Sequence, residues 1–210
     1  MYPLTDIFQG VRHRYILPII ISVLLIVACS GSDKPEVETL AFTVDSALLG
    51  ESFTDSVSGL VLQAPINWQK LPDETVEQVQ AGIAANPGDS DQPVPEILAL
   101  FSLQEYNAHL VVGRYEPKLT SAHLDSVLLW QREGLRTQFP NGNVLSSKFL
   151  HNQSLFEQML VVGDEFAVIK LFVRREGRGM VHIEYVAHRS WYETHLRAIE
   201  SSIGSISLES

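Results

Sequence analysis

Hydrophobic residues occur in two different arrangements along this chain. Near the amino terminus they form one block, Tyr15 to Ala28, which is interrupted only by Pro18 and Ser22. From about residue 57 onward they recur at every second position, as in a half-buried strand, or at every third or fourth position, as in an amphipathic helix. The chain therefore divides into a leader and a folded part, and the two require separate interpretations.

The folded part is expected to contain both strands and helices. Strands are predicted at residues 57–65, 97–104, 109–116, 144–150, 155–162, 165–175 and 180–186, and helices at residues 71–86, 120–139 and 190–202. Gly163 and Asp164, between two apolar runs, indicate a two-residue hairpin turn. Ser190 and Glu193 match a capping box, which predicts the start of the last helix. Residues 166–173 are apolar on both faces, as expected of a central strand covered on both sides.

This order of elements predicts an α+β fold, in which one antiparallel sheet packs against about three helices. Residues 52–210 are expected to form this single domain. Residues 29–51 are rich in polar and turn-forming residues and predict a flexible tether, although the apolar patch from Leu40 to Val44 is also compatible with a strand or clip.

The leader has the layout of a secretory signal peptide. Arg12, His13 and Arg14 form a basic segment that precedes the apolar run. That run is 14 residues long, whereas a helix that spans a bilayer needs about 20 apolar residues. Residues 1–28 are therefore predicted to be a signal peptide rather than a permanent membrane anchor.

The end of this run resembles the lipobox of bacterial lipoproteins. Ile26, Val27 and Ala28 precede Cys29, the only cysteine in the chain, and Ser30 follows it. The resemblance implies that Cys29 becomes the first residue of the mature protein and carries a diacylglycerol and an amide-linked acyl chain. Two or three acyl chains make a stable anchor. Ser30 stands where Asp resembles an inner-membrane retention signal, so the outer membrane is favoured, with the domain facing the periplasm.

The folded part resembles the PsbP-like family, including its bacterial lipoprotein relatives of the DcrB type. The resemblance rests on the strand Gly59 to Ala64, which leads into Pro65 and Trp68, on the helix after a hairpin, on the long meander, and on the closing helix that ends near Ile203. It covers about residues 52–208. It implies an α/β/α sandwich and extrinsic association with membrane complexes rather than catalysis.

Composition and charge narrow the possible partners. Hydrophobic residues make up 45% of the 210 residues, which is typical of a globular protein. The formal net charge is -10, from 15 Lys and Arg against 25 Asp and Glu. This balance argues against nucleic acid as a partner, because binding to phosphates needs a clustered positive surface.

Candidate metal ligands occur in one segment only. His182 and Glu184 share one face of a predicted strand, and His188 follows shortly after it. A zinc site would need a third ligand from elsewhere, for which His109 and His151 are candidates. The alternative is that these residues form a solvated or half-buried strand face. We favour that alternative and therefore expect neither a metal nor another cofactor.

Three other groups have both a structural and a ligand-binding interpretation. They are the acidic pair Asp89 and Asp91, the tryptophans Trp68, Trp130 and Trp191, and the arginines Arg174, Arg175 and Arg178 of a hairpin turn. The acidic pair lacks the rest of a calcium loop. Tryptophans at element ends usually pack in a core, and the arginines are most simply a solvated turn, with lipid headgroups or an acidic partner as the alternative.

The sequence also lacks the common catalytic motifs, including a nucleophile elbow, a Walker loop and a zinc-protease helix. We therefore expect a lipid-anchored, non-catalytic accessory protein of the bacterial envelope that binds another protein or complex. Two alternatives remain open. One is a lipoprotein that binds a small molecule or metal between its sheet and helices, and the other is a hydrolase whose catalytic residues are scattered in sequence.

Overall fold

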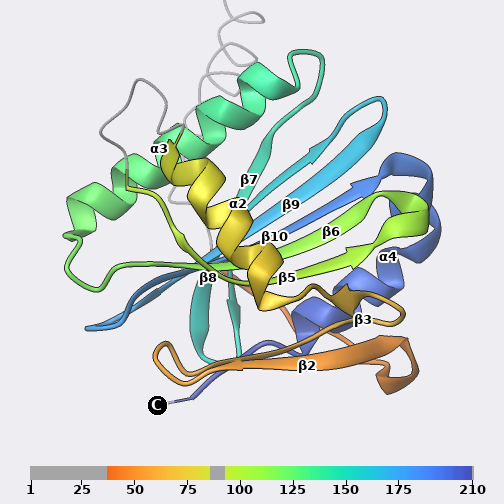
Figure 1. The fold of residues 1–210 in the computed structure, drawn as a ribbon, viewed down its shortest axis with the longest axis horizontal. Helices are drawn as coiled ribbons and strands as arrows, with labels where there is room; N and C mark the ends of the chain where they lie inside the picture. Colours follow the sequence, from red (N-terminus) through yellow and green to blue (C-terminus); the bar gives the residue numbers. More distant parts are fainter. Residues whose placement is uncertain (1–36, 86–92, 210) are drawn as a thin grey trace, which may run out of the picture. The chain divides into compact units, whose positions relative to one another are not determined.

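The computed structural model describes residues 37–85 and 93–209. The chain divides into two units, residues 1–36 and residues 37–210. In the described part of the second unit, eight strands form a mixed sheet in the order β1-β7-β8-β9-β10-β6-β5-β4, and three strands form a second sheet in the order β11-β3-β2 (Figure 1). Only the pairing of β1 with β7 is parallel among these described strands.

The strands of the large sheet are β1 Glu38–Thr39, β4 Gln69–Lys70, β5 Glu96–Leu103, β6 Ala108–Tyr115, β7 Leu145–His151, β8 Ser154–Val162, β9 Phe166–Arg175 and β10 Gly179–His188. The strands of the second sheet are β2 Leu49–Asp55, β3 Leu60–Pro65 and β11 Ser207–Leu208. The helices are α2 Asp73–Ala85, α3 Ser121–Gln138 and α4 Arg189–Gly204, with short 3-10 helices η1 Ser46–Leu48 and η2 Gln104–Tyr106.

Helices α2 and α3 lie on the same face of the large sheet (Figure 1). The apolar stripe of α3, which includes Val127 and Leu135, packs on Phe172 of β9. Helix α2 packs through Val76 on β5, against the same side of the sheet. Thr120 caps α3, since its hydroxyl accepts a hydrogen bond from the backbone N–H of His123. The predicted helix at 120–139 is therefore confirmed.

The opposite face of the large sheet carries the larger core. Helix α4 contributes Trp191, Ile199 and Ile203, and β3 contributes Leu60 and Leu62, to one buried cluster. Strand β9 supplies side chains to both faces, with Leu171 in this cluster and Phe172 in the cluster beneath α3. The prediction that residues 166–173 form a central strand covered on both sides is confirmed.

The α+β class and the three α-helices agree with the sequence-based prediction, but the single antiparallel sheet does not. Strand β3 pairs with β2 and β11 through its backbone, while its side chains pack on the large sheet. A strand that packs face-on against a sheet cannot also extend that sheet by hydrogen bonding. The first predicted strand therefore belongs to a separate layer.

Part of the expected tether at residues 29–51 contributes to the fold. The backbone N–H of Leu40 donates to the carbonyl of Leu150, 2.9 Å away. The ring of Phe42 packs edge-on against Phe149, with centroids 5.8 Å apart, and lies directly over Gly204. The apolar patch from Leu40 to Val44 thus clips the chain onto the domain, which was the alternative interpretation of this segment.

Two local details also differ from the prediction. Helix α4 is capped by His188, whose Nδ1 accepts a hydrogen bond from the backbone N–H of Ser190. Ser190 is already inside the helix, so the predicted capping box is wrong. Glu193 instead accepts a hydrogen bond from Nε of Arg189 at 2.8 Å. The turn between β8 and β9 contains three residues rather than two.

No helix in residues 37–85 or 93–209 is long and apolar enough to cross a membrane.

Candidate functional site

A connected group of polar side chains lies on the sheet face beneath α3. It consists of Lys170 on β9, His182 and Glu184 on β10, Gln131 on α3 and Tyr115 on β6. Lys170 and Glu184 are directly opposite each other in the β9–β10 pair. Because side chains alternate along a strand, His182 and Glu184 point to the same face, as the sequence predicts. The strand register therefore brings these groups together.

Lys170 is the centre of this network. Its Nζ lies 3.1 Å from Oε2 of Glu184 and donates a hydrogen bond to Oε1 of Gln131 at 2.7 Å. Nε2 of Gln131 in turn donates to the hydroxyl oxygen of Tyr115 at 3.3 Å. The charge of Lys170 is therefore balanced within the protein by the carboxylate of Glu184, and the amide oxygen of Gln131 accepts one further hydrogen bond from it.

His182 is packed between aromatic rings. Its imidazole stacks on Phe172, with centroids 4.8 Å apart and an interplanar angle of 7°. The ring of Tyr115 lies beside the imidazole, with centroids 6.3 Å apart and an interplanar angle of 43°. Its Nε2 is 3.4 Å from Oε2 of Glu184. Among the described residues neither ring nitrogen has a hydrogen-bond partner of normal geometry.

These contacts determine the charge of Glu184. Burial by itself raises the pKa of a carboxyl group. The contacts with His182 and Lys170 outweigh burial and lower the pKa of Glu184 to about 2. Burial raises the pKa of Tyr115 to about 12. At neutral pH Glu184 is therefore an ionised carboxylate and Tyr115 is a neutral phenol.

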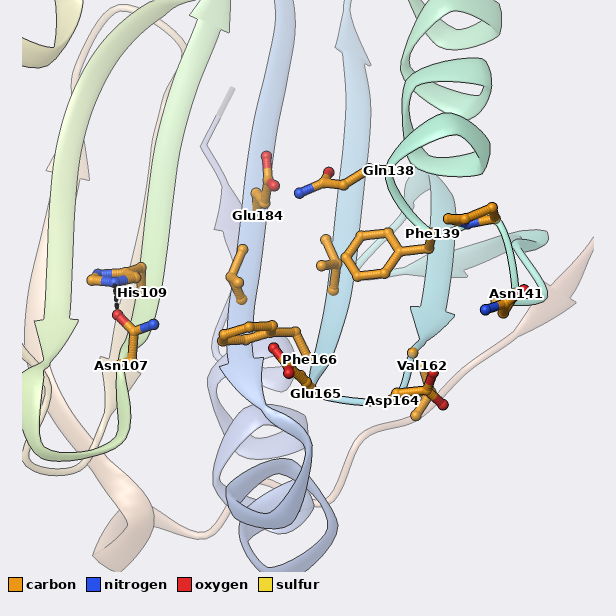
Figure 2. Close-up of a pocket in the computed structure, with 15 residues that line it drawn as sticks. Asn107, His109, Gln138, Phe139, Asn141, Val162, Asp164, Glu165, Phe166 and Glu184 are labelled. Carbon is orange, nitrogen blue, oxygen red and sulfur yellow. Dashed lines mark hydrogen bonds between the residues drawn. The ribbon is translucent and has the colours of Figure 1, made fainter.

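Glu184 also faces a pocket with a volume of about 530 Å³ at one end of the sheet (Figure 2). The pocket lies between the C-terminal end of α3, the β8–β9 turn and the neighbouring strands β10 and β6. Its lining consists of Asn107, His109, Gln138, Phe139, Pro140, Asn141, Gly142, Val162, Gly163, Asp164, Glu165, Phe166, Val168, Glu184 and Val186. Small-molecule pockets commonly have volumes of about 300–1,000 Å³.

Two glycines allow Phe139 to form a wall of this pocket. A Cβ atom on Gly163 would lie 2.9 Å from Cδ1 of Phe139, and one on Gly142 would lie 3.1 Å from Cβ of Phe139. A side chain at position 163 would therefore press on the ring of Phe139, and one at position 142 would press on Val161, 2.8 Å away, and crowd Phe139. Phe139 follows directly after α3, and its backbone N–H donates to the carbonyl of Leu135, which fixes its place relative to the helix.

The candidate metal ligands are only partly brought together. His182 and Glu184 are neighbours, but His188 lies at the start of α4, where its Nδ1 contacts Oγ of Ser190 at 2.8 Å. His109 lines the pocket and contacts Asn107. His151 is buried beside the carbonyl of Gly204. No group of three or more His, Cys, Asp or Glu suited to a metal occurs among the residues that the structure describes.

The other candidates have mainly structural environments. Trp68 and Trp191 pack in the core beneath α4, whereas Trp130 on α3 is 46% exposed. Arg175 and Arg178 donate hydrogen bonds to the backbone carbonyl of Glu209. Arg174 pairs with two acidic side chains, those of Asp125 and Glu157. Cys29, Asp89 and Asp91 lie outside the described residues.

The sequence did not identify Lys170, Phe139 or the pocket itself. Lys170 is the one polar residue within the otherwise apolar segment 166–173, and Gln131 is a polar residue in the apolar stripe of α3. A polar side chain at a core position on each of two elements is the signal that could have revealed this network, since buried polar groups require partners.

No protein-family model matches this chain, and no curated protein sequence matches it either. Among solved structures, the crystal structure of a protein of unknown function from Pseudomonas aeruginosa is similar, with a TM-score of 0.43 and 12% sequence identity. The similarity covers 77% of this chain and 99% of that one.

Proposed function

We propose that this protein is a lipid-anchored, non-catalytic binding protein of the bacterial cell envelope, and that the pocket beside α3 holds its ligand. The observation that supports binding is the pocket itself, a solvent-open cavity of about 530 Å³ with apolar walls and a few polar groups. Of the alternatives that the sequence left open, this pocket favours a small-molecule ligand.

The state of Glu184 supports the non-catalytic part of the proposal. A general acid or base works best when its pKa lies near the operating pH. The pKa of Glu184 is about 2, and its Oε2 is held by Lys170 at 3.1 Å. A carboxylate in this state is a poor proton carrier at neutral pH.

The anchor is proposed from the lipobox ending at Cys29, and the outer membrane is favoured over the inner because Ser30 follows the cysteine. Bacteria that express the wild-type chain should incorporate radiolabelled palmitate into it, and the Cys29→Ser variant should incorporate none. Ser30→Ala is the matched control and should still be labelled. Continued labelling of Cys29→Ser would exclude Cys29 as the lipid site.

The binding proposal is tested by blocking the pocket. Val186 lines it from β10, so Val186→Trp should fill much of the cavity. Full-length wild type and variant would be purified from membranes, and their solvent extracts compared by mass spectrometry. Val57→Trp is the control, because Val57 is 52% exposed in a turn. A small molecule that is enriched with wild type and with the control, but not with Val186→Trp, supports the proposal. Equal extracts from all three proteins contradict it.

One observation favours a partner protein as the second candidate function. Leu129 and Trp130 are adjacent on α3 and are 59% and 46% exposed. Large exposed apolar side chains that lie together are typical of interaction surfaces. If this surface binds a partner, Trp130→Ser should reduce the yield of a specific crosslinked complex in native membranes while Val57→Ser does not. An unchanged yield for Trp130→Ser would exclude this surface.

A further inference from the structure

We propose that the pocket recognises a compact organic cation, namely a protonated amine or quaternary ammonium group carried on an apolar body. This inference rests on the proposed function, because it names the class of ligand that the same pocket would hold. Three features of the pocket lead to it: the charge of its lining, the aromatic rings in its walls, and the pairing of the nearby cationic side chains with other groups of the protein.

The charged side chains that line the pocket are all carboxylates, apart from the titratable His109. They are Glu184 near the sheet, and Asp164 and Glu165 in the exposed β8–β9 turn. No Lys or Arg is among the described residues of the lining. A low-dielectric cleft lined by charges of one sign concentrates ligands of the opposite sign. The charge of the pocket is thus complementary to a cation.

The nearest cationic side chains are already paired inside the protein. Lys170 is bound by Glu184 and Gln131, so it offsets the charge of Glu184, and it is not among the residues that line the pocket. Arg189, at the surface, pairs with Glu193 at 2.8 Å, donates to the carbonyl of Gly163 at 3.4 Å and partly offsets the charge of Asp164. The carboxylates of Asp164 and Glu165 at the turn therefore carry most of the attraction.

Aromatic rings form part of the pocket lining beside these charges. In the view of Figure 2 the ring of Phe166 lies next to the carboxylate of Glu165, on the side of Glu184, and the ring of Phe139 lies to one side, nearer α3. Val168 and Val186 complete the apolar surface. The face of an aromatic ring attracts a cation through its quadrupole, and this interaction contributes about 0.5–2 kcal/mol to binding. Apolar walls beside carboxylates match a ligand that has both an apolar body and an ammonium group.

The same lining argues for a free amine rather than a phospholipid headgroup. Phosphatidylethanolamine carries a phosphate next to its amine, and phosphate recognition uses Arg, Lys or a cluster of backbone N–H groups. The lining offers carboxylates instead, which would repel the phosphate. The ligand is therefore a soluble cation that enters from the open side of the pocket.

Equilibrium dialysis of the full-length protein in non-ionic detergent tests this inference. The probes are phenethylammonium, 2-phenylethanol and 3-phenylpropanoate, which share one apolar body and carry a positive, a neutral and a negative group. Micelles without protein give the background. We expect phenethylammonium to bind at least about tenfold more tightly than 3-phenylpropanoate, with 2-phenylethanol between them, which would reflect an electrostatic difference of about 1.4 kcal/mol.

Two double variants, each of which removes two negative charges, show where on the protein the attraction for the cation arises. Asp164→Asn with Glu165→Gln should weaken binding of the cation about fivefold to tenfold and leave binding of the alcohol within about twofold. Glu116→Gln with Glu176→Gln changes the net charge equally at the opposite end of the sheet, and it should leave the binding of all three probes within about twofold.

The outcomes separate the two proposals. If the alcohol or the carboxylate binds as tightly as the cation, and Val186→Trp abolishes that binding, the pocket is a binding site and the inferred ligand class is wrong. If none of the three probes binds above background, both the ligand class and the pocket's role as a binding site are refuted. If both double variants weaken the cation equally, the attraction comes from net charge, and the inference is refuted.

Discussion

The pH dependence of stability offers a sharp test of the network around Glu184. We consider the variant Glu184→Gln, which removes the charge and keeps the size of the side chain. In the folded protein the pKa of Glu184 is about 2, against an ordinary value of 4.5. Each pKa unit is worth about 1.4 kcal/mol. The ionised carboxylate therefore contributes about 3 kcal/mol to the free energy of unfolding at neutral pH.

Because folding lowers the pKa of Glu184, its contribution to the free energy of unfolding is lost at low pH. A carboxyl group whose pKa is lower in the folded state stabilises the protein fully above its unfolded pKa, and the stabilisation is lost as pH falls towards its folded pKa. For Glu184 the window runs from about pH 4.5 down to about pH 2. Within it, the stability advantage of wild type over Glu184→Gln should shrink by about 1.4 kcal/mol per pH unit.

The assay is urea unfolding of the full-length proteins, followed by tryptophan fluorescence between pH 2.5 and 7. Only the difference between wild type and Glu184→Gln is interpreted, because other groups titrate in both proteins. Glu176→Gln, at an exposed turn, shows what a Glu to Gln change does outside the network. A difference between wild type and Glu184→Gln that stays constant across this range would refute the reasoning.

Two further changes test contacts that hold the layers and the pocket together. Arg114→Leu should lower the free energy of unfolding by about 1–3 kcal/mol, measured by urea unfolding, because it removes the guanidinium that lies 2.9 Å from the carboxylate of Asp55 and leaves that carboxylate only its hydrogen bonds from Ser58 and Val57; a loss below about 0.5 kcal/mol would contradict this. Gly163→Ala should lower the free energy of unfolding by about 1–3 kcal/mol, because the added Cβ would press on Phe139. In α3, an added Cβ at Gly134 would contact no neighbouring atom, so Gly134→Ala should raise the free energy of unfolding by up to about 1 kcal/mol. Equal effects of the two alanine substitutions would refute the steric argument.

Elements with a strong local signal were predictable from the sequence. Helix α3 has an apolar stripe at helical spacing and a capping residue, Thr120. Strand β9 is apolar on both faces because it lies in the middle of the sheet with a core on each side. In both elements the local pattern reflects burial directly, so periodicity is sufficient to identify them.

The second sheet depends on contacts between distant parts of the chain. Strand β2 is mostly exposed or half-buried, so Leu49–Asp55 shows no clear alternation of apolar and polar residues. Its partners in β3 are only 5 to 16 positions away, but the pairing of β3 with β11 brings together residues about 150 positions apart. That long-range pairing leaves little trace in a local pattern. The single-sheet prediction failed for this reason.

The candidate site was predictable only in part. The alternation of side chains along a strand placed His182 and Glu184 on one face. The position of Lys170 opposite Glu184 depends on the register of the β9–β10 hairpin, which the sequence alone did not fix. The pocket depends on Phe139, which lies against Gly142, three residues further on, and against Gly163 of the β8–β9 turn. No motif of neighbouring residues marks that arrangement.

The central claim is that a lipid-anchored chain presents this domain at the bacterial membrane. Its most direct test is mass spectrometry of the protein extracted from native membranes, with sequencing of the amino-terminal peptide. We predict that the mature chain begins at Cys29 and that this residue carries the mass of a diacylglycerol, usually with one further acyl chain. A chain that retains residues 1–28, or that has an unmodified thiol at Cys29, would contradict the account.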